Sequence, residues 1–141
     1  MTPRRNNIIK ALHGWKGETA AVPKLSEDGL QRQCITWFAS QYPHLWKAKR
    51  LHSVPNGGKR NKVTAAILKA TGQVRGVFDL HLTIPKGRWA GMLIESKVGK
   101  NKLSEDQEIF MREHENEYYC CVVRSLDDFM REIKNYLNTK S

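Results

Sequence analysis

The feature that most constrains the fold is a pair of apolar segments on either side of a tight turn. Residues 76–84 and 89–98 consist mainly of apolar side chains, and Pro85-Lys86-Gly87-Arg88 separates them. Proline and glycine favour turns, and apolar segments of this length around a turn predict two antiparallel strands. A β-hairpin is therefore expected in the second half of the chain.

The segments around this hairpin show helical and strand patterns in turn. Three helices are expected to begin after a serine that can cap the first turn, at Ser26, Ser104 and Ser125. The other expected elements are strands over 46–54 and 118–124 and a helix from Asn61 to Gly72, while Tyr42-Pro43 ends the first helix. This order predicts an α/β fold with a mixed central β-sheet flanked by helices.

The chain length of 141 residues suits one compact domain. We expect residues 1–24 to form a basic N-terminal arm, or a disordered tail, and residues 25–141 to form a single domain. No apolar run is long enough to cross a bilayer, and no signal-peptide segment follows the basic start. Cys34, Cys120 and Cys121 lack the paired spacing of a zinc site. These features predict a protein of the reduced cytoplasm.

The positive charge is concentrated in one part of the sequence. The formal net charge is +10, and no Asp or Glu occurs between Gly29 and Phe78. The basic residues of that stretch are Arg32, Lys47, Lys49, Arg50, Lys59, Arg60, Lys62, Lys69 and Arg75. Basic proteins can owe their charge to solubility alone, but an acid-free stretch of this length favours a polyanionic partner such as nucleic acid.

Three charged residues interrupt the apolar hairpin. Side chains alternate along a strand, so Glu95 and Lys97 share one face, and the turn can bring Asp79 of the preceding strand close to Glu95. Two neighbouring carboxylates repel each other, and a divalent ion such as Mg²⁺ relieves that repulsion and activates bound water. The alternative is a buried acid–lysine pair that satisfies only itself.

Several short motifs accompany this triplet along the chain. They are Glu27-x-x-x-Gln31, the run from His52 to Arg60, Val74-Arg75-Gly76-Val77-Phe78-Asp79-Leu80, Glu95-Ser96-Lys97, Leu103-Ser104-Glu105-Asp106-Gln107 and Val123-Arg124-Ser125. In this order they resemble the virus-type replication-repair nuclease (VRR-NUC) domain of the PD-(D/E)XK nuclease superfamily. Phe78 departs from the family, which usually has Pro there, and Ser96 stands where an apolar residue is commoner.

The resemblance implies a restriction-endonuclease-like fold and a Mg²⁺ or Mn²⁺ site. Asp79, Glu95 and the main-chain carbonyl of Ser96 would be metal ligands, and Glu27 would bind a metal directly or through water. Lys97 would serve catalysis, and Gln107 would support the site from its helix. Gln107 could instead close a capping box after Ser104, and Glu27 could simply favour the first turn of its helix.

Residues of the basic stretch are expected to hold DNA phosphates around this site. The candidates are Asn56, Lys59, Arg60, Lys62 and Arg75. The alternative for the turn that contains the first three is a surface loop with solvated cations. His52 could act as a general base or phosphate contact, or form a structural hydrogen bond.

Small standalone members of the VRR-NUC family resemble Holliday-junction resolvases from phages. The resemblance therefore implies a metal-dependent endonuclease for branched DNA in recombination and repair, encoded by a phage and active in a bacterial cell. A four-way junction needs two symmetric cuts, which a C2 homodimer can make. Two other classes stay open: a monomeric flap or single-strand nuclease, and a nonenzymatic basic DNA-binding module.

Overall fold

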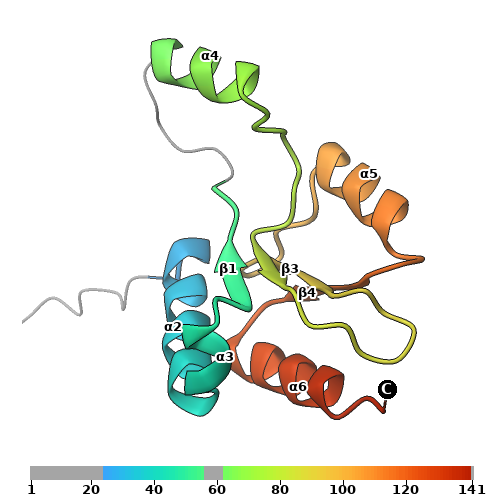
Figure 1. Cartoon of the computed structure of the whole chain (residues 1–141). Helices are drawn as coiled ribbons and strands as arrows, with labels where there is room; N and C mark the ends of the chain where they lie inside the picture. The colour runs from blue at the N-terminus through green and yellow to red at the C-terminus, as the bar shows by residue number, and fades with distance from the viewer. Residues whose placement is uncertain (1–23, 56–61, 141) are drawn as a thin grey trace, which may run out of the picture.

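The computed structural model describes residues 24–55 and 62–140, arranged as in Figure 1. Its elements are α2 (Glu27–Gln41), α3 (Pro43–Lys47), β1 (Leu51–Ser53), α4 (Lys62–Ala70), β2 (Leu80–Leu82), β3 (Met92–Ser96), α5 (Glu105–His114), β4 (Tyr119–Val123) and α6 (Leu126–Leu137). Residues 1–23 of the expected arm lie outside the described residues. None of the helices described is long and apolar enough to cross a membrane.

The strands form one four-stranded sheet in the order β1-β2-β3-β4. The first three strands pair antiparallel, and β3 pairs with β4 in parallel. A parallel pair needs a crossover connection, and α5 lies within it between β3 and β4. The α/β fold with a mixed sheet flanked by helices, expected from the sequence, is confirmed.

The two faces of the sheet have different roles. On the core face, Leu80 pairs with Ile94 and Ile94 with Cys121, and these buried side chains pack in one cluster with α2 and α6. The opposite face, here called the α5 face, carries the alternate residues, among them His81 and Leu93. Phe110 of α5 lies over it, with its ring centroid 6.5 Å from that of His81.

The three expected serine caps are present. Ser26 accepts a hydrogen bond from the amide of Gly29, and Ser125 accepts one from the amide of Asp128. Ser104 and Gln107 form a complete capping box at the start of α5. Each cap satisfies amides that the first turn of a helix leaves without partners.

Three expected strands are shorter than the sequence patterns indicated. The strand over 46–54 is wrong in its first part, because Pro43 begins the short helix α3 and β1 covers only Leu51–Ser53. Proline suits the first position of a helix, since its fixed φ is already helical and its missing N–H has no partner there. Likewise, only Leu80–Leu82 of residues 76–84 and Met92–Ser96 of residues 89–98 form regular strands.

Gly76 explains why the chain before β2 does not continue the strand. Its φ is +85°, and a Cβ at this position would lie 2.5 Å from the backbone carbonyl carbon of Asp106. The segment before β2 therefore runs directly against the first turn of α5, a contact that only glycine allows. This contact fixes α5 beside the segment that leads to Asp79.

Helix α4 stands apart from the rest of the described molecule (Figure 1). It has no buried residue, and Val63 and Ile67 are 71% and 58% exposed. Gly72, with φ +105°, follows its C-terminal end, close to the end predicted from the sequence.

We expect Gly76→Ala to destabilise the domain more than Gly99→Ala. Gly99 also has a positive φ, of 56°, but a Cβ there would meet no atom within 4 Å. Gly99→Ala should therefore lower the free energy of unfolding by about 1–2 kcal/mol through backbone strain alone. Gly76→Ala adds the collision with Asp106. Its free energy of unfolding, measured in urea, should therefore fall by clearly more than that of Gly99→Ala. Equal losses would contradict the tight contact between this segment and α5.

Candidate active site

Asp79 and Glu95 face each other across neighbouring strands. The register pairs Leu80 with Ile94, so the next position along both strands places Asp79 opposite Glu95 on the α5 face. The Val54 amide donates to the Asp79 carbonyl at 2.9 Å, which holds Asp79 in line with β1. The Ser96 amide donates to Asp79 Oδ2 at 3.3 Å. The sequence prediction that the hairpin brings these two acids together is confirmed.

Glu95 and Lys97 are charged residues in a buried position. Glu95 is 1% exposed and Lys97 is 9% exposed, and Lys97 Nζ lies 3.9 Å from Glu95 Oε2. The other carboxylate oxygen, Glu95 Oε1, is buried and has no hydrogen-bond partner among the described residues. A buried polar atom without a partner carries a free-energy cost, so this oxygen is a natural attachment point for a ligand.

The environment favours protonation of the acid pair. Burial, followed by the charge of Asp79, raises the pKa of Glu95 to about 9. Burial also raises the pKa of Asp79, although hydrogen bonds from Glu95 and the Ser96 amide oppose this shift. Without a cation, the pair therefore holds a proton more tightly than two separate carboxyl groups would.

This donor set fits a hard divalent cation. Within residues 24–55 and 62–140, no three His, Cys, Asp or Glu side chains form a metal-binding group, so the acids act as a pair. Mg²⁺ commonly uses one or two carboxylates and takes its other ligands from water and phosphate. A bound cation would give Oε1 a partner and would offset the repulsion between the two carboxylates.

Glu27 lies at the edge of this pair. It is close enough for its charge to raise the pKa of both Asp79 and Glu95. The Asn101 side chain donates to Glu27 Oε1 at 3.3 Å. Arg124 donates to the carbonyls of Gly99 and Asn101, and so holds the loop that follows β3. Asn101 carries no signal in the sequence, because 74 positions separate it from Glu27 and no spacing pattern links them.

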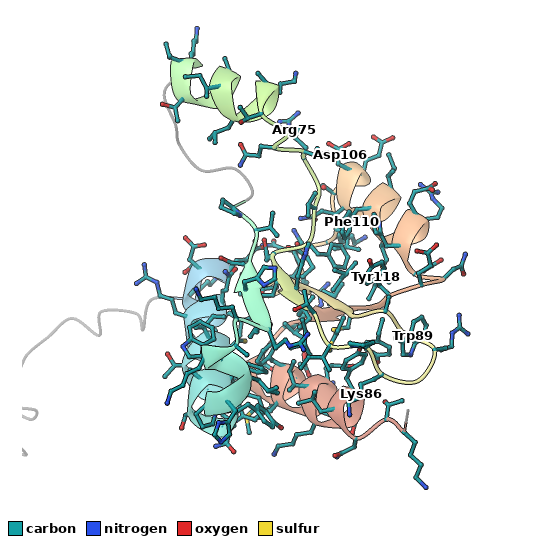
Figure 2. All side chains as sticks on the ribbon, viewed as in Figure 1. Arg75, Lys86, Trp89, Asp106, Phe110 and Tyr118 are labelled. Atoms are coloured by element: carbon teal, nitrogen blue, oxygen red, sulfur yellow. The ribbon has the colours of Figure 1, made fainter. Side chains whose placement is uncertain are left out.

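Gln107 has the structural role that the sequence left open. Its Oε1 accepts a hydrogen bond from the Ser104 amide at 2.9 Å and so completes the capping box. Gln107 and Arg75 also line an open hollow at the N-terminal end of α5. Figure 2 shows Arg75 beside Asp106 in this region. The capping bond uses the amide oxygen of Gln107 and leaves its amide nitrogen for other contacts.

The structure describes two of the five proposed DNA-binding residues. Lys62 and Arg75 are exposed, whereas Asn56, Lys59 and Arg60 lie outside the described residues. His52 Nδ1 lies 3.2 Å from the Lys49 carbonyl oxygen. This contact is a structural hydrogen bond, one of the two roles expected for His52. Burial raises the pKa of Cys34 to about 12 and that of Cys120 to about 11, so these thiols stay protonated.

One solved structure, described as a VRR_NUC domain protein, shares this fold. The two chains superpose with a TM-score of 0.71 at 23% sequence identity, over 85% of this chain and 94% of the other. No protein-family model matches the sequence, and no curated protein matches it. At this identity the likeness concerns the fold, and it confirms the nuclease-like fold that the motifs predicted.

The raised pKa of Glu95 predicts how stability depends on pH in the presence of EDTA. The stabilising effect of its proton is fully present below the ordinary pKa of 4.5 and is lost as the pH rises through about 9. Between pH 4.5 and about 9, the thermal unfolding temperature of the wild type should therefore fall relative to that of Glu95→Gln, whose side chain cannot titrate. Glu108→Gln, at an exposed position of α5, should keep the wild-type slope. Identical slopes for wild type and Glu95→Gln would contradict the assigned shift.

Proposed function

We propose that this protein is a divalent-metal-dependent nuclease that hydrolyses phosphodiester bonds in DNA. The observation that carries the proposal is the buried pair Asp79 and Glu95, opposed across two strands, with Lys97 beside it and Glu95 Oε1 without a partner. The fold shared with a VRR_NUC domain protein supports the same reaction class. A nonenzymatic DNA-binding module would gain nothing from two buried acids that repel each other.

Asp79 and Glu95 would hold a Mg²⁺ or Mn²⁺ ion through their carboxylates. The Ser96 carbonyl would be a further ligand, and Glu27 would act directly or through water. A bound ion of this kind lowers the pKa of water and offsets negative charge on a phosphate under attack. The Ser96 amide keeps Asp79 in place by its 3.3 Å hydrogen bond, so the carboxylate is oriented before any ligand arrives.

Lys97 would stabilise the charge that develops on the phosphate. Its ammonium group is only 3.9 Å from Glu95 Oε2, so it lies next to the proposed reaction centre. In a buried site with little water, a fixed positive donor acts more strongly than it would in solution. Gln107 would support the site through its amide nitrogen, since its oxygen caps α5.

DNA phosphates would be held by basic residues of the acid-free stretch. Arg75 lies in the segment that leads to Asp79, and Lys62 belongs to the exposed helix α4. Asn56, Lys59 and Arg60 belong to the same acid-free stretch of sequence. Contacts from such residues to phosphate would give affinity without sequence preference.

The chemical assignment predicts the effects of three substitutions on cleavage of labelled DNA. Asp79→Asn, Glu95→Gln and Lys97→Ala should each lower the cleavage rate by at least about 100-fold, because each removes charge from the reacting centre. The matched controls Asp127→Asn and Glu108→Gln change exposed acids and should cut at the wild-type rate. Wild-type cleavage in EDTA, or an active Asp79→Asn variant, would refute the metal-dependent mechanism.

For the substrate, we propose a four-way DNA junction cut by a homodimer. One domain supplies one acid pair, and a junction requires two cuts related by symmetry. The exposed apolar side chains of α4 support assembly, because such surface favours association. The competing candidates are a flap or a single strand cut by a monomer.

A plasmid with an extruded cruciform distinguishes these substrates. A homodimer should make both cuts within one binding event and convert the plasmid directly to the linear form. A monomer should accumulate nicked circles, and light scattering of the same sample reports the oligomeric state. The plasmid without the inverted repeat is the control and should stay supercoiled. Nicking by a monomer would exclude the resolvase proposal and leave the nuclease chemistry intact.

A further inference from the structure

A second hollow lies between the α5 face of the sheet and α5, beside the acid pair. Strand residues His81 and Leu93, together with Gly91, line its sheet side, and Phe110, His114 and Tyr118 line the other. Gly91 opens the hollow because it has no side chain: a Cβ there would lie 2.9 Å from the Leu82 carbonyl oxygen and 3.5 Å from the Tyr118 ring. The volume is about 270 Å³.

Aromatic rings form a stacked series around this hollow. The rings of Phe110 and His114 are 4.1 Å apart with an interplanar angle of 28°, and those of Phe110 and His81 are 6.5 Å apart at 20°. Figure 2 shows the labelled rings of Phe110 and Tyr118 between α5 and the sheet. Ring faces in this arrangement favour a flat, aromatic ligand.

The polar side chains that line the hollow are His81, His114, Thr83 and Tyr118, and the two histidines carry its ring nitrogens. His114 Nδ1 lies 2.7 Å from the Phe110 carbonyl oxygen, which can only accept, so Nδ1 carries the proton and Nε2 of the neutral ring is an acceptor. His81 Nε2 is buried and finds no hydrogen-bond partner in the part of the chain that is described. Among the described residues, no Asp, Glu, Lys or Arg lines the hollow, so none of them supplies a charged side chain for a phosphate or a hard cation.

The hollow lies next to the proposed reaction centre. His81 is two positions after Asp79 and Leu93 is two positions before Glu95, so all four side chains share the α5 face. Two positions along a strand correspond to about 7 Å. A group in the hollow would therefore belong to a nucleotide adjacent to the phosphate under attack.

We propose that this hollow binds one unpaired nucleobase of the DNA substrate, stacked on the aromatic rings with an amino or imino N–H directed to the histidines. This inference rests on the proposed nuclease function, because it uses the position of the reacting phosphate. The hollow is smaller than the roughly 300–1,000 Å³ pockets that hold drug-sized ligands, which suits a single ring system. A base inside a duplex cannot enter, so the hollow takes a base that is unpaired, either in a flap or where pairing opens at the crossover of a junction.

The test measures DNA binding in EDTA, where cleavage does not interfere. The probe is a dye-labelled duplex with a short single-stranded flap, and an abasic residue replaces each unpaired nucleotide in turn. Fluorescence anisotropy should show binding about tenfold weaker for one abasic position, since a base stacked on protein rings contributes on this order. An equal affinity for every abasic probe would overturn the proposal.

Substitutions show whether the weaker binding of an abasic probe comes from this hollow. Ala90 lies at its exposed rim, and Ala90→Trp should fill it and remove the difference between normal and abasic probes. The matched control Ala48→Trp, at an exposed position after α3, should keep that difference. His114→Phe keeps a ring but loses the acceptor, so it should keep the abasic effect and reduce preference among the four bases. An abasic effect that persists in Ala90→Trp would place the base elsewhere.

The same preparations separate this inference from the proposed function. Cleavage with Mg²⁺ but no abasic effect leaves the nuclease standing and refutes the base-binding hollow. No cleavage with Mg²⁺ or Mn²⁺, together with a clear abasic effect that Ala90→Trp removes, refutes the nuclease and supports the hollow.

Discussion

The electrostatic cost of holding Asp79 and Glu95 opposite each other governs the organisation of this domain. The antiparallel register of β2 and β3 forces the two carboxyl groups together, and burial removes the water that would screen them. The fold offsets part of this cost with the Ser96 amide and the Lys97 ammonium group. The remainder appears as the raised pKa of Glu95.

The alternation of side chains along β3 separates stability from chemistry. Ile94 faces the core with α2 and α6, while Glu95 on the next position faces α5. The core face therefore carries the apolar packing, and the α5 face carries the buried charges of Glu95 and Lys97. The parallel pairing with β4 buries β3 between two neighbours, which keeps the acid-bearing strand rigid.

Local sequence signals predicted most of the architecture and the proximity of Asp79 to Glu95. The serine caps, the turn at 85–88 and the alternation around Glu95 act over a few residues, so their effects are visible in sequence. The sequence did not predict the contact between Asn101 and Glu27, or the hollow above Gly91, since both depend on segments that only folding brings together. The short helix α3 was missed because Pro43 can end one helix and begin the next.

Helix α4 differs from the other helices in what maintains it. An isolated helix of nine residues is below the length at which helices persist in water, and α4 buries no side chain against the described body of the molecule. It therefore contributes almost nothing to the cooperative unfolding of the domain and can open in a local transition of its own. The order of α4 is thus set by whatever solvent, salt or partner surrounds it, and the core of the domain exerts little control over it.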